Sequence, residues 1–212
     1  MRKHFFYEMR LAVHPAIWLL PIALAILRVV TGGSLERVLV FFEFVYPLLF
    51  PIAVISLLRR ERSDRTFEVL VATPHRKTPV LLARLVGVML PLFCAVAATV
   101  SPGNWLSVLA PGVLLAMLAL VTGLVWKDEI GLAVPLGWWA VSFAVSFTQM
   151  TWGHHAVGSW FILFLLGSGL SPEAILWRKL GHLAVAAMLL SVSLLMAETW
   201  PRSASPCRHR TS

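Results

Sequence analysis

Three histidines are the side chains of this sequence best suited to bind a metal ion or a haem. His154 and His155 are adjacent, and His182 lies further along the chain. Imidazole is a frequent ligand of both groups. Adjacent residues of a helix point to different sides, however, and no cluster of carboxylates or cysteines joins the histidines in the sequence. We therefore predict interface or loop histidines, with no metal or cofactor bound by this chain.

Hydroxyl groups suggest a second chemistry, that of an intramembrane enzyme. Such an enzyme needs a nucleophile and a base at matching depth, or a pair of acids. Ser142, Ser146 and His182 supply the residue types, but nothing in the sequence marks them as one unit. We predict no catalytic residues and no enzymatic activity, and we keep an intramembrane enzyme as an alternative hypothesis.

Glu43 is a carboxylate inside a long apolar stretch. Carboxylates within a membrane are costly to bury and often functional. Arg28 or Arg37 could pair with Glu43, so a structural ion pair and a substrate or gating role both stay open. Pro47 and Pro51 follow on the same helical face and are predicted to bend the helix. Together with Glu43, the two prolines are candidates for a pathway or a gate.

The composition indicates that these residues are positioned by membrane-spanning helices. Apolar residues make up 58% of the 212, charged residues only 13%, and mean hydropathy is +0.81. A soluble domain carries roughly 25% charged residues. The apolar runs are long and show little alternation, which favours helices over barrel strands. The net charge of +8 falls in short loops, so it predicts topology and contact with anionic lipid headgroups, not nucleic-acid binding.

The sequence predicts an all-α integral membrane protein with six transmembrane helices in one domain, residues 1–200, and a polar tail at 201–212. The predicted spans are 13–30, 38–58, 79–100, 106–126, 132–150 and 180–196. Thr78 is predicted to cap the span that begins at Pro79. The apolar segment 156–170 is short for a crossing, so we predict a re-entrant or extracytoplasmic segment before the last span.

Lysine and arginine counts predict the orientation of the spans. With both termini in the cytoplasm, the six-span arrangement places segment 59–78 and most other basic residues inside, and only Arg37, Arg178 and Lys179 outside. Counting 156–170 as a seventh span gives a similar excess of lysine and arginine on the cytoplasmic side. Charge therefore fixes the orientation of the first five spans only, and the short length of 156–170 favours a total of six spans. We predict a multi-pass protein of a bacterial inner or plasma membrane.

The loop 59–78 is long and polar for a small membrane protein, and it contains a predicted amphipathic helix. Phe67, Leu70 and Val71 recur at i, i+3 and i+4, which forms one apolar face. Pro74 ends the helix. This apolar face needs a partner, either the membrane or the rest of the protein, or a groove on a cytoplasmic protein.

The same segment resembles the signature of ABC-2 type transporter permeases. In that family an acidic residue is followed by a Gly-Thr-Leu/Phe-Glu-x-Leu-Leu-x-Thr/Ser-Pro run and then by a basic patch. The matching residues here are Glu61, Thr66, Phe67, Glu68, Leu70, Thr73, Pro74, Arg76 and Lys77. Arg65 stands where the family has glycine. Segment 156–170 also resembles the family's broken outward helices.

The resemblance implies that the chain is one half of a transporter, completed by a second copy or a sister permease. A separate cytoplasmic ABC ATPase would bind ATP and magnesium, and this sequence has no G-x-x-x-x-G-K-[ST] run of its own. The predicted loop helix would be the coupling helix, with Phe67 and Leu70 buried in the ATPase. Glu68, Arg76 and Lys77 would set its orientation by charge.

The resemblance also implies export, and the apolar spans suit a hydrophobic or amphipathic substrate. Haem-export permeases have a similar size and number of spans, so haem export stays open as an alternative. A secondary carrier is a further alternative, although such carriers usually show inverted repeats and more polar residues near the midplane, which this sequence lacks.

Overall fold

The computed structural model describes residues 35–63, 77–100, 104–126, 128–152 and 171–199. This part of the chain is helical throughout and contains no strand. Its five helices are α3 (Leu35–Ser63), α5 (Lys77–Thr99), α6 (Trp105–Val125), α7 (Asp128–Trp152) and α8 (Pro172–Thr199). The prediction of an all-α protein is therefore confirmed for the described residues. The predicted first span, segment 156–170 and the tail lie outside them.

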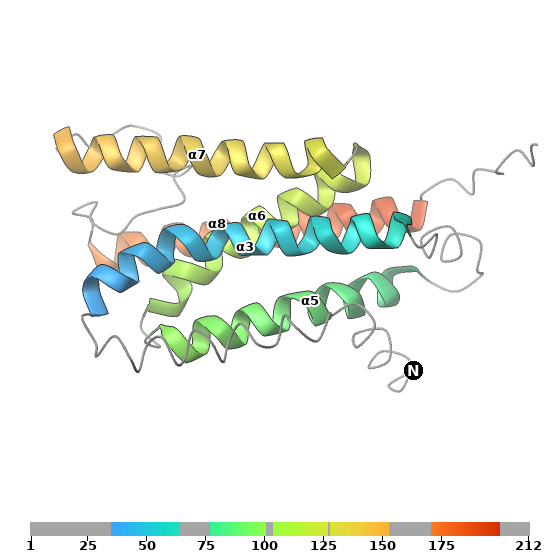
Figure 1. Cartoon of the computed structure of the whole chain (residues 1–212), viewed down its shortest axis with the longest axis horizontal. Helices are drawn as coiled ribbons and strands as arrows, with labels where there is room; N and C mark the ends of the chain where they lie inside the picture. The colour runs from blue at the N-terminus through green and yellow to red at the C-terminus, as the bar shows by residue number, and fades with distance from the viewer. Residues whose placement is uncertain (1–34, 64–76, 101–103, 127, 153–170, 200–212) are drawn as a thin grey trace, which may run out of the picture.

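Helix α6 is the centre of the bundle. It packs against α3, α5, α7 and α8, and in Figure 1 it runs obliquely behind α3. The most apolar stretch of α6 is 72% buried, whereas that of α8 is only 22% buried. Helices α3, α6 and α8 run towards one end of the molecule, and α5 and α7 return from it (Figure 1). We call this end, where α3 finishes in a run of arginines, the basic end, and the other the far end.

Three helices are long and apolar enough to cross a membrane, namely Thr78–Thr99, Trp105–Val125 and Glu173–Thr199. At ~1.5 Å per residue, helices of this length match a ~30 Å hydrocarbon core. Large apolar side chains are also exposed along α8, among them Trp177, Met188 and Leu195, which suits contact with acyl chains. These features are those of a membrane-associated protein.

Close helix packing in the core depends on glycines of α6. A Cβ atom added at Gly112 would lie 2.7 Å from the ring of Phe50 on α3. That ring is fully buried and meets Phe93 of α5 edge to face, with 5.8 Å between the ring centroids. Because a buried ring has little room to shift, a side chain at position 112 would overpack this part of the core.

The helix bounds differ from the prediction mainly in α8. This helix begins at Pro172, earlier than the predicted residue 180, so Arg178 and Lys179 lie inside a helix and not in an outer loop. Lys179 is 1% exposed and His182 is 5% exposed. His182 is therefore a buried helix residue and not a loop residue, and a position at the depth of the membrane interface stays a prediction. Hydropathy along one segment cannot show that a polar residue is buried against another helix.

Candidate functional site: the basic end of the bundle

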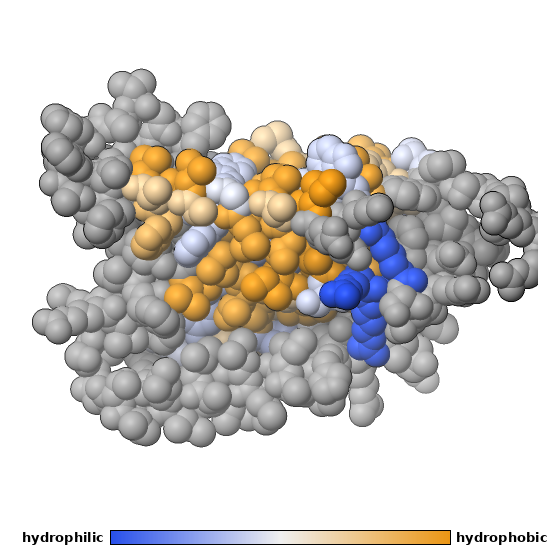
Figure 2. All heavy atoms as spheres, turned by 45° about the horizontal axis from the view of Figure 1, so that its top comes forward, coloured by the Kyte–Doolittle hydropathy of each residue, from blue (hydrophilic) through white to orange (hydrophobic). Residues whose placement is uncertain are grey.

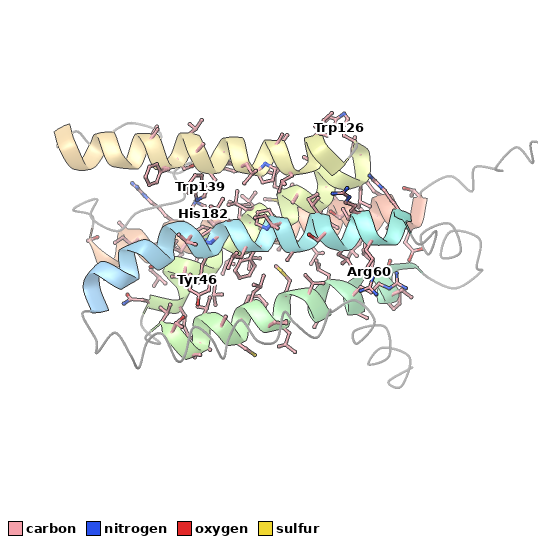
Figure 3. All side chains as sticks on the ribbon, viewed as in Figure 1. Tyr46, Arg60, Trp126, Trp139 and His182 are labelled. Atoms are coloured by element: carbon pink, nitrogen blue, oxygen red, sulfur yellow. The ribbon has the colours of Figure 1, made fainter. Side chains whose placement is uncertain are left out.

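The basic end carries the exposed arginines with which α3 finishes. Arg59, Arg60 and Arg62 are all exposed, and Figure 3 shows Arg60 at this end beside the start of α5. Figure 2 shows a broad apolar face that gives way to hydrophilic side chains towards one end. Helix α5 begins at Lys77, so α3 and α5 frame segment 64–76, where most of the predicted coupling residues fall.

Arg62 ties the end of α3 to the end of α6. Its Nη2 donates to the carbonyl oxygen of Gly123 and, at 3.4 Å, to that of Trp126. The last carbonyls of a helix lack partners within the helix, and a cation there complements the helix dipole. The guanidinium therefore caps the C-terminus of α6 from a neighbouring helix.

Glu198 of α8 ties the start of α5 to the end of α8. Its Oε1 accepts a hydrogen bond of 3.0 Å from the backbone N–H of Thr78, and it also accepts one from the Thr78 hydroxyl. A carboxylate is favourable at a helix N-terminus, where N–H groups have no partner within the helix. The sequence predicted Thr78 as a cap, whereas the structure places it within the first turn of α5, with Glu198 as the acceptor.

A third contact joins α6 to α7 at the same end. A Cβ atom added at Gly131 would lie 2.8 Å from the Cα of Gly123, so the two helices meet backbone to backbone. The Thr122 hydroxyl lies within hydrogen-bond distance of the Gly131 carbonyl oxygen, at 3.0 Å, and of the Leu118 carbonyl of its own helix, at 2.8 Å. Arg62, which bonds the Gly123 carbonyl, thus contacts α6 next to its closest approach to α7.

These contacts give segment 64–76 two mechanical connections to the bundle. Its leading helix, α3, is bound to α6 by Arg62, and its trailing helix, α5, is bound to α8 by Glu198. A force on the segment would act on α3 and α5 first. Through the two polar contacts it would also act on α6 and α8, and α8 has the largest part of its contact with α6.

The predicted coupling residues fall mostly outside the described residues. This holds for Thr66, Phe67, Glu68, Leu70, Thr73, Pro74 and Arg76. The backbone of Glu61 is in the last turn of α3, and that of Lys77 is the first residue of α5. The existence of a coupling helix between them stays a prediction.

Of the predicted pathway residues, Glu43 and Pro47 lie in the half of α3 towards the far end, and Pro51 lies just past its middle. The backbone of Glu43 is helical, and α3 continues through Pro47 and Pro51. Both prolines are buried, so they face other helices of the bundle. A role of Glu43 in an ion pair or in gating stays a prediction, because Arg28 lies outside the described residues.

Other polar residues are buried between the helices, without forming a metal centre. The hydroxyl of Tyr46 is 2.9 Å from Thr99 Oγ1, which joins α3 to α5. Ser142 and His182 are buried on α7 and α8, and Figure 3 shows His182 and Trp139 in the same half of the bundle as Tyr46. Among the residues that the structure describes, no group of three or more His, Cys, Asp or Glu could hold a metal ion.

Two residues of the site were not singled out by sequence reasoning. Arg62 was counted only as a charge of the loop, and Glu198 was not considered. A signal for Glu198 is present, because an acid in the last turn of a helix opposes the dipole of that helix and so needs a partner elsewhere. No protein-family model, curated protein or solved structure matches this chain.

Proposed function

We propose that this chain is the membrane-spanning permease subunit of an ABC transporter that exports a hydrophobic or amphipathic substrate. A separate cytoplasmic ATPase, which binds ATP and magnesium, would supply the energy. Six spans, a cytoplasmic basic end and a second permease subunit belong to this proposal. It is supported by the motif at 61–77 and by the long apolar helices on either side of it.

The observation that carries the proposal is the placement of the motif between two helices that are each tied to a different neighbour. Segment 64–76 follows α3, whose Arg62 bonds the end of α6, and precedes α5, whose Thr78 bonds Glu198 of α8. A coupling element needs such connections, because a load on an unattached loop would move the loop alone. ATP-driven closure of the ATPase would push the segment and shift the helices attached to it.

The test is the double substitution Phe67→Asp with Leu70→Asp in the full chain, co-expressed with ABC ATPases of the same organism. Two carboxylates on the predicted apolar face would face a large desolvation cost in a hydrophobic groove. We expect normal membrane insertion and loss of the co-purified ATPase, together with loss of transport-dependent ATP turnover. The matched control is Ala72→Asp, on the other side of the predicted helix, which should retain the ATPase.

Unchanged ATPase association and turnover in the double variant would remove the proposal. Loss of membrane insertion in the double variant, with normal insertion of Ala72→Asp, would show that the apolar face serves folding and would also count against it.

A further inference from the structure

Lys179 is a lysine buried in the bundle near the far end, in the first part of α8. It is 1% exposed, and its Nζ donates to the carbonyl oxygen of Ser107 on α6 at 3.1 Å. A buried ammonium loses its hydration, which costs several kcal/mol unless hydrogen bonds replace it. The acceptor, the Ser107 carbonyl of α6, needs a donor from another helix, and this need accounts for the buried ammonium.

The Ser107 carbonyl lacks its usual partner because of a proline. In an α-helix it would accept from the N–H of the residue four positions on, and that residue is Pro111, which lies inside α6. Proline has no N–H, and its ring also pushes against the carbonyl four residues earlier. Lys179 of α8 therefore supplies the donor that α6 itself cannot supply.

A second proline in the bundle also leaves a carbonyl without its N–H donor. There the contacting side chain from the neighbouring helix is a short one. Pro135 of α7 removes the donor for the Gly131 carbonyl, whose oxygen lies 3.0 Å from the Thr122 hydroxyl of α6. That hydroxyl has a single proton, which it shares with the Leu118 carbonyl of its own helix at 2.8 Å. There the backbones of Gly123 and Gly131 touch. A threonine hydroxyl reaches its acceptor only at this close approach, so the joint at Pro135 is fixed.

We propose that α6 has a hinge at Pro111 and that Lys179 is the movable donor that keeps the freed Ser107 carbonyl hydrogen-bonded while α6 bends. An ammonium on a flexible four-carbon stem has three rotatable donors, so it can follow the carbonyl where a backbone N–H could not. The bundle then has a fixed joint at the basic end, at Pro135, and a flexible joint towards the far end. Movement of the far end during transport rests on the proposed function, whereas the hinge itself does not.

The first experiment is a double-mutant cycle of thermal unfolding with the full chain in lipid nanodiscs. Pro111→Ala restores the N–H for Ser107, so it should remove the need for Lys179. We expect Lys179→Met to lower Tm by roughly 4–8 °C more in the native background than in the Pro111→Ala background, as for a carbonyl left without a donor. Equal shifts in the two backgrounds would overturn the assignment of Lys179 to this carbonyl.

The second experiment measures bending and needs no change at Lys179, so it remains decisive if Lys179→Met does not fold. Pairs of spin labels are placed on exposed positions, Trp105 with Val125 along α6 and Trp177 with Leu195 along α8. The native cysteines, Cys94 and Cys207, are first replaced by serine. Helix α8 has no proline after its first residue, so its label pair is the matched control.

We expect a broader distance distribution for the α6 pair than for the α8 pair, and we expect Pro111→Ala to narrow the α6 distribution to the width of the control. Equal widths for the two pairs before any change at Pro111 would overturn the hinge. Both experiments measure this chain without an ATPase, so their results do not depend on transport. Failure of the hinge can therefore be distinguished from failure of the proposed transporter function.

Discussion

At the scale of single residues, the bundle contains positions where contacts with another helix determine which residue type is accommodated. Gly112 is the clearest case, because the buried ring of Phe50 occupies the space that a Cβ atom would need. Lys179 is a second case, since its ammonium replaces a backbone donor that Pro111 removes. Both depend on partners on another helix, so neither could be predicted from the local sequence.

Gly112→Ala should destabilise the chain by roughly 1–3 kcal/mol, the usual cost of overpacking a core. The added methyl group must displace Phe50, whose ring is fully buried and in edge-to-face contact with Phe93. The measurement is thermal or denaturant unfolding in detergent. The matched control is Gly137→Ala on α7, where nothing lies within 4 Å of the added atom. The control should be neutral or slightly stabilising, because alanine favours a helix by about 1 kcal/mol over glycine. An equal loss of stability in both variants would contradict this packing.

At the scale of helices, two termini at the basic end are hydrogen-bonded to side chains of neighbouring helices. Arg62 of α3 caps α6, and Glu198 of α8 caps α5. Sequence reasoning located α6 to within one residue of both observed ends, because this helix is continuously apolar. It placed the start of α8 too late, because Arg178 and Lys179 look like loop residues until the burial of Lys179 against α6 is known.

Glu198→Ala should weaken the first turn of α5 by roughly 0.5–1 kcal/mol, since both groups are exposed to some degree and a lost helix cap costs about this much. Backbone hydrogen exchange of Thr78, Val80 and Leu81 should increase, and the matched control Thr199→Ala should leave it unchanged. The Thr199 hydroxyl bonds only carbonyls of its own helix in the described structure. Unchanged exchange at α5 in Glu198→Ala would argue against the cap.

Arg62→Gln should separate binding from coupling if the proposed function is correct. The variant loses the charged donor to the last carbonyls of α6, while the apolar face at Phe67 and Leu70 is untouched. We expect normal ATPase association with a several-fold lower rate of transport per ATP hydrolysed. Arg59→Gln, which removes an exposed charge two residues before Glu61, is the control and should keep the native ratio. Native coupling in Arg62→Gln would contradict the role given to this contact.

At the scale of the whole molecule, α6 is the central helix to which the other described helices are attached. Successive described helices run in alternating directions (Figure 1), and α3 finishes in exposed arginines at the basic end, where Figure 3 labels Arg60. The sequence was sufficient for the fold class and for the order of the apolar helices. It could not show the inter-helix contacts, since each one joins residues that are distant in the chain.

The two ends of α6 should face opposite sides of the membrane. Trp105 and Trp126 are both exposed at these ends, so Trp105→Cys and Trp126→Cys in a background without native cysteines form a matched pair. A membrane-impermeant maleimide should label position 105 on intact cells and position 126 only in inverted vesicles. Labelling of both positions from the same side would show that α6 does not cross the membrane.

The most direct measurement of the central claim is photocrosslinking from position 70 in living cells, with a photoreactive amino acid replacing Leu70 in the full chain. If segment 64–76 couples this permease to an ATPase, the adduct should contain an ABC ATPase, and placing the probe at position 72 should strongly reduce it. An adduct with lipid alone at position 70, or with this chain's own helices alone, would contradict the account.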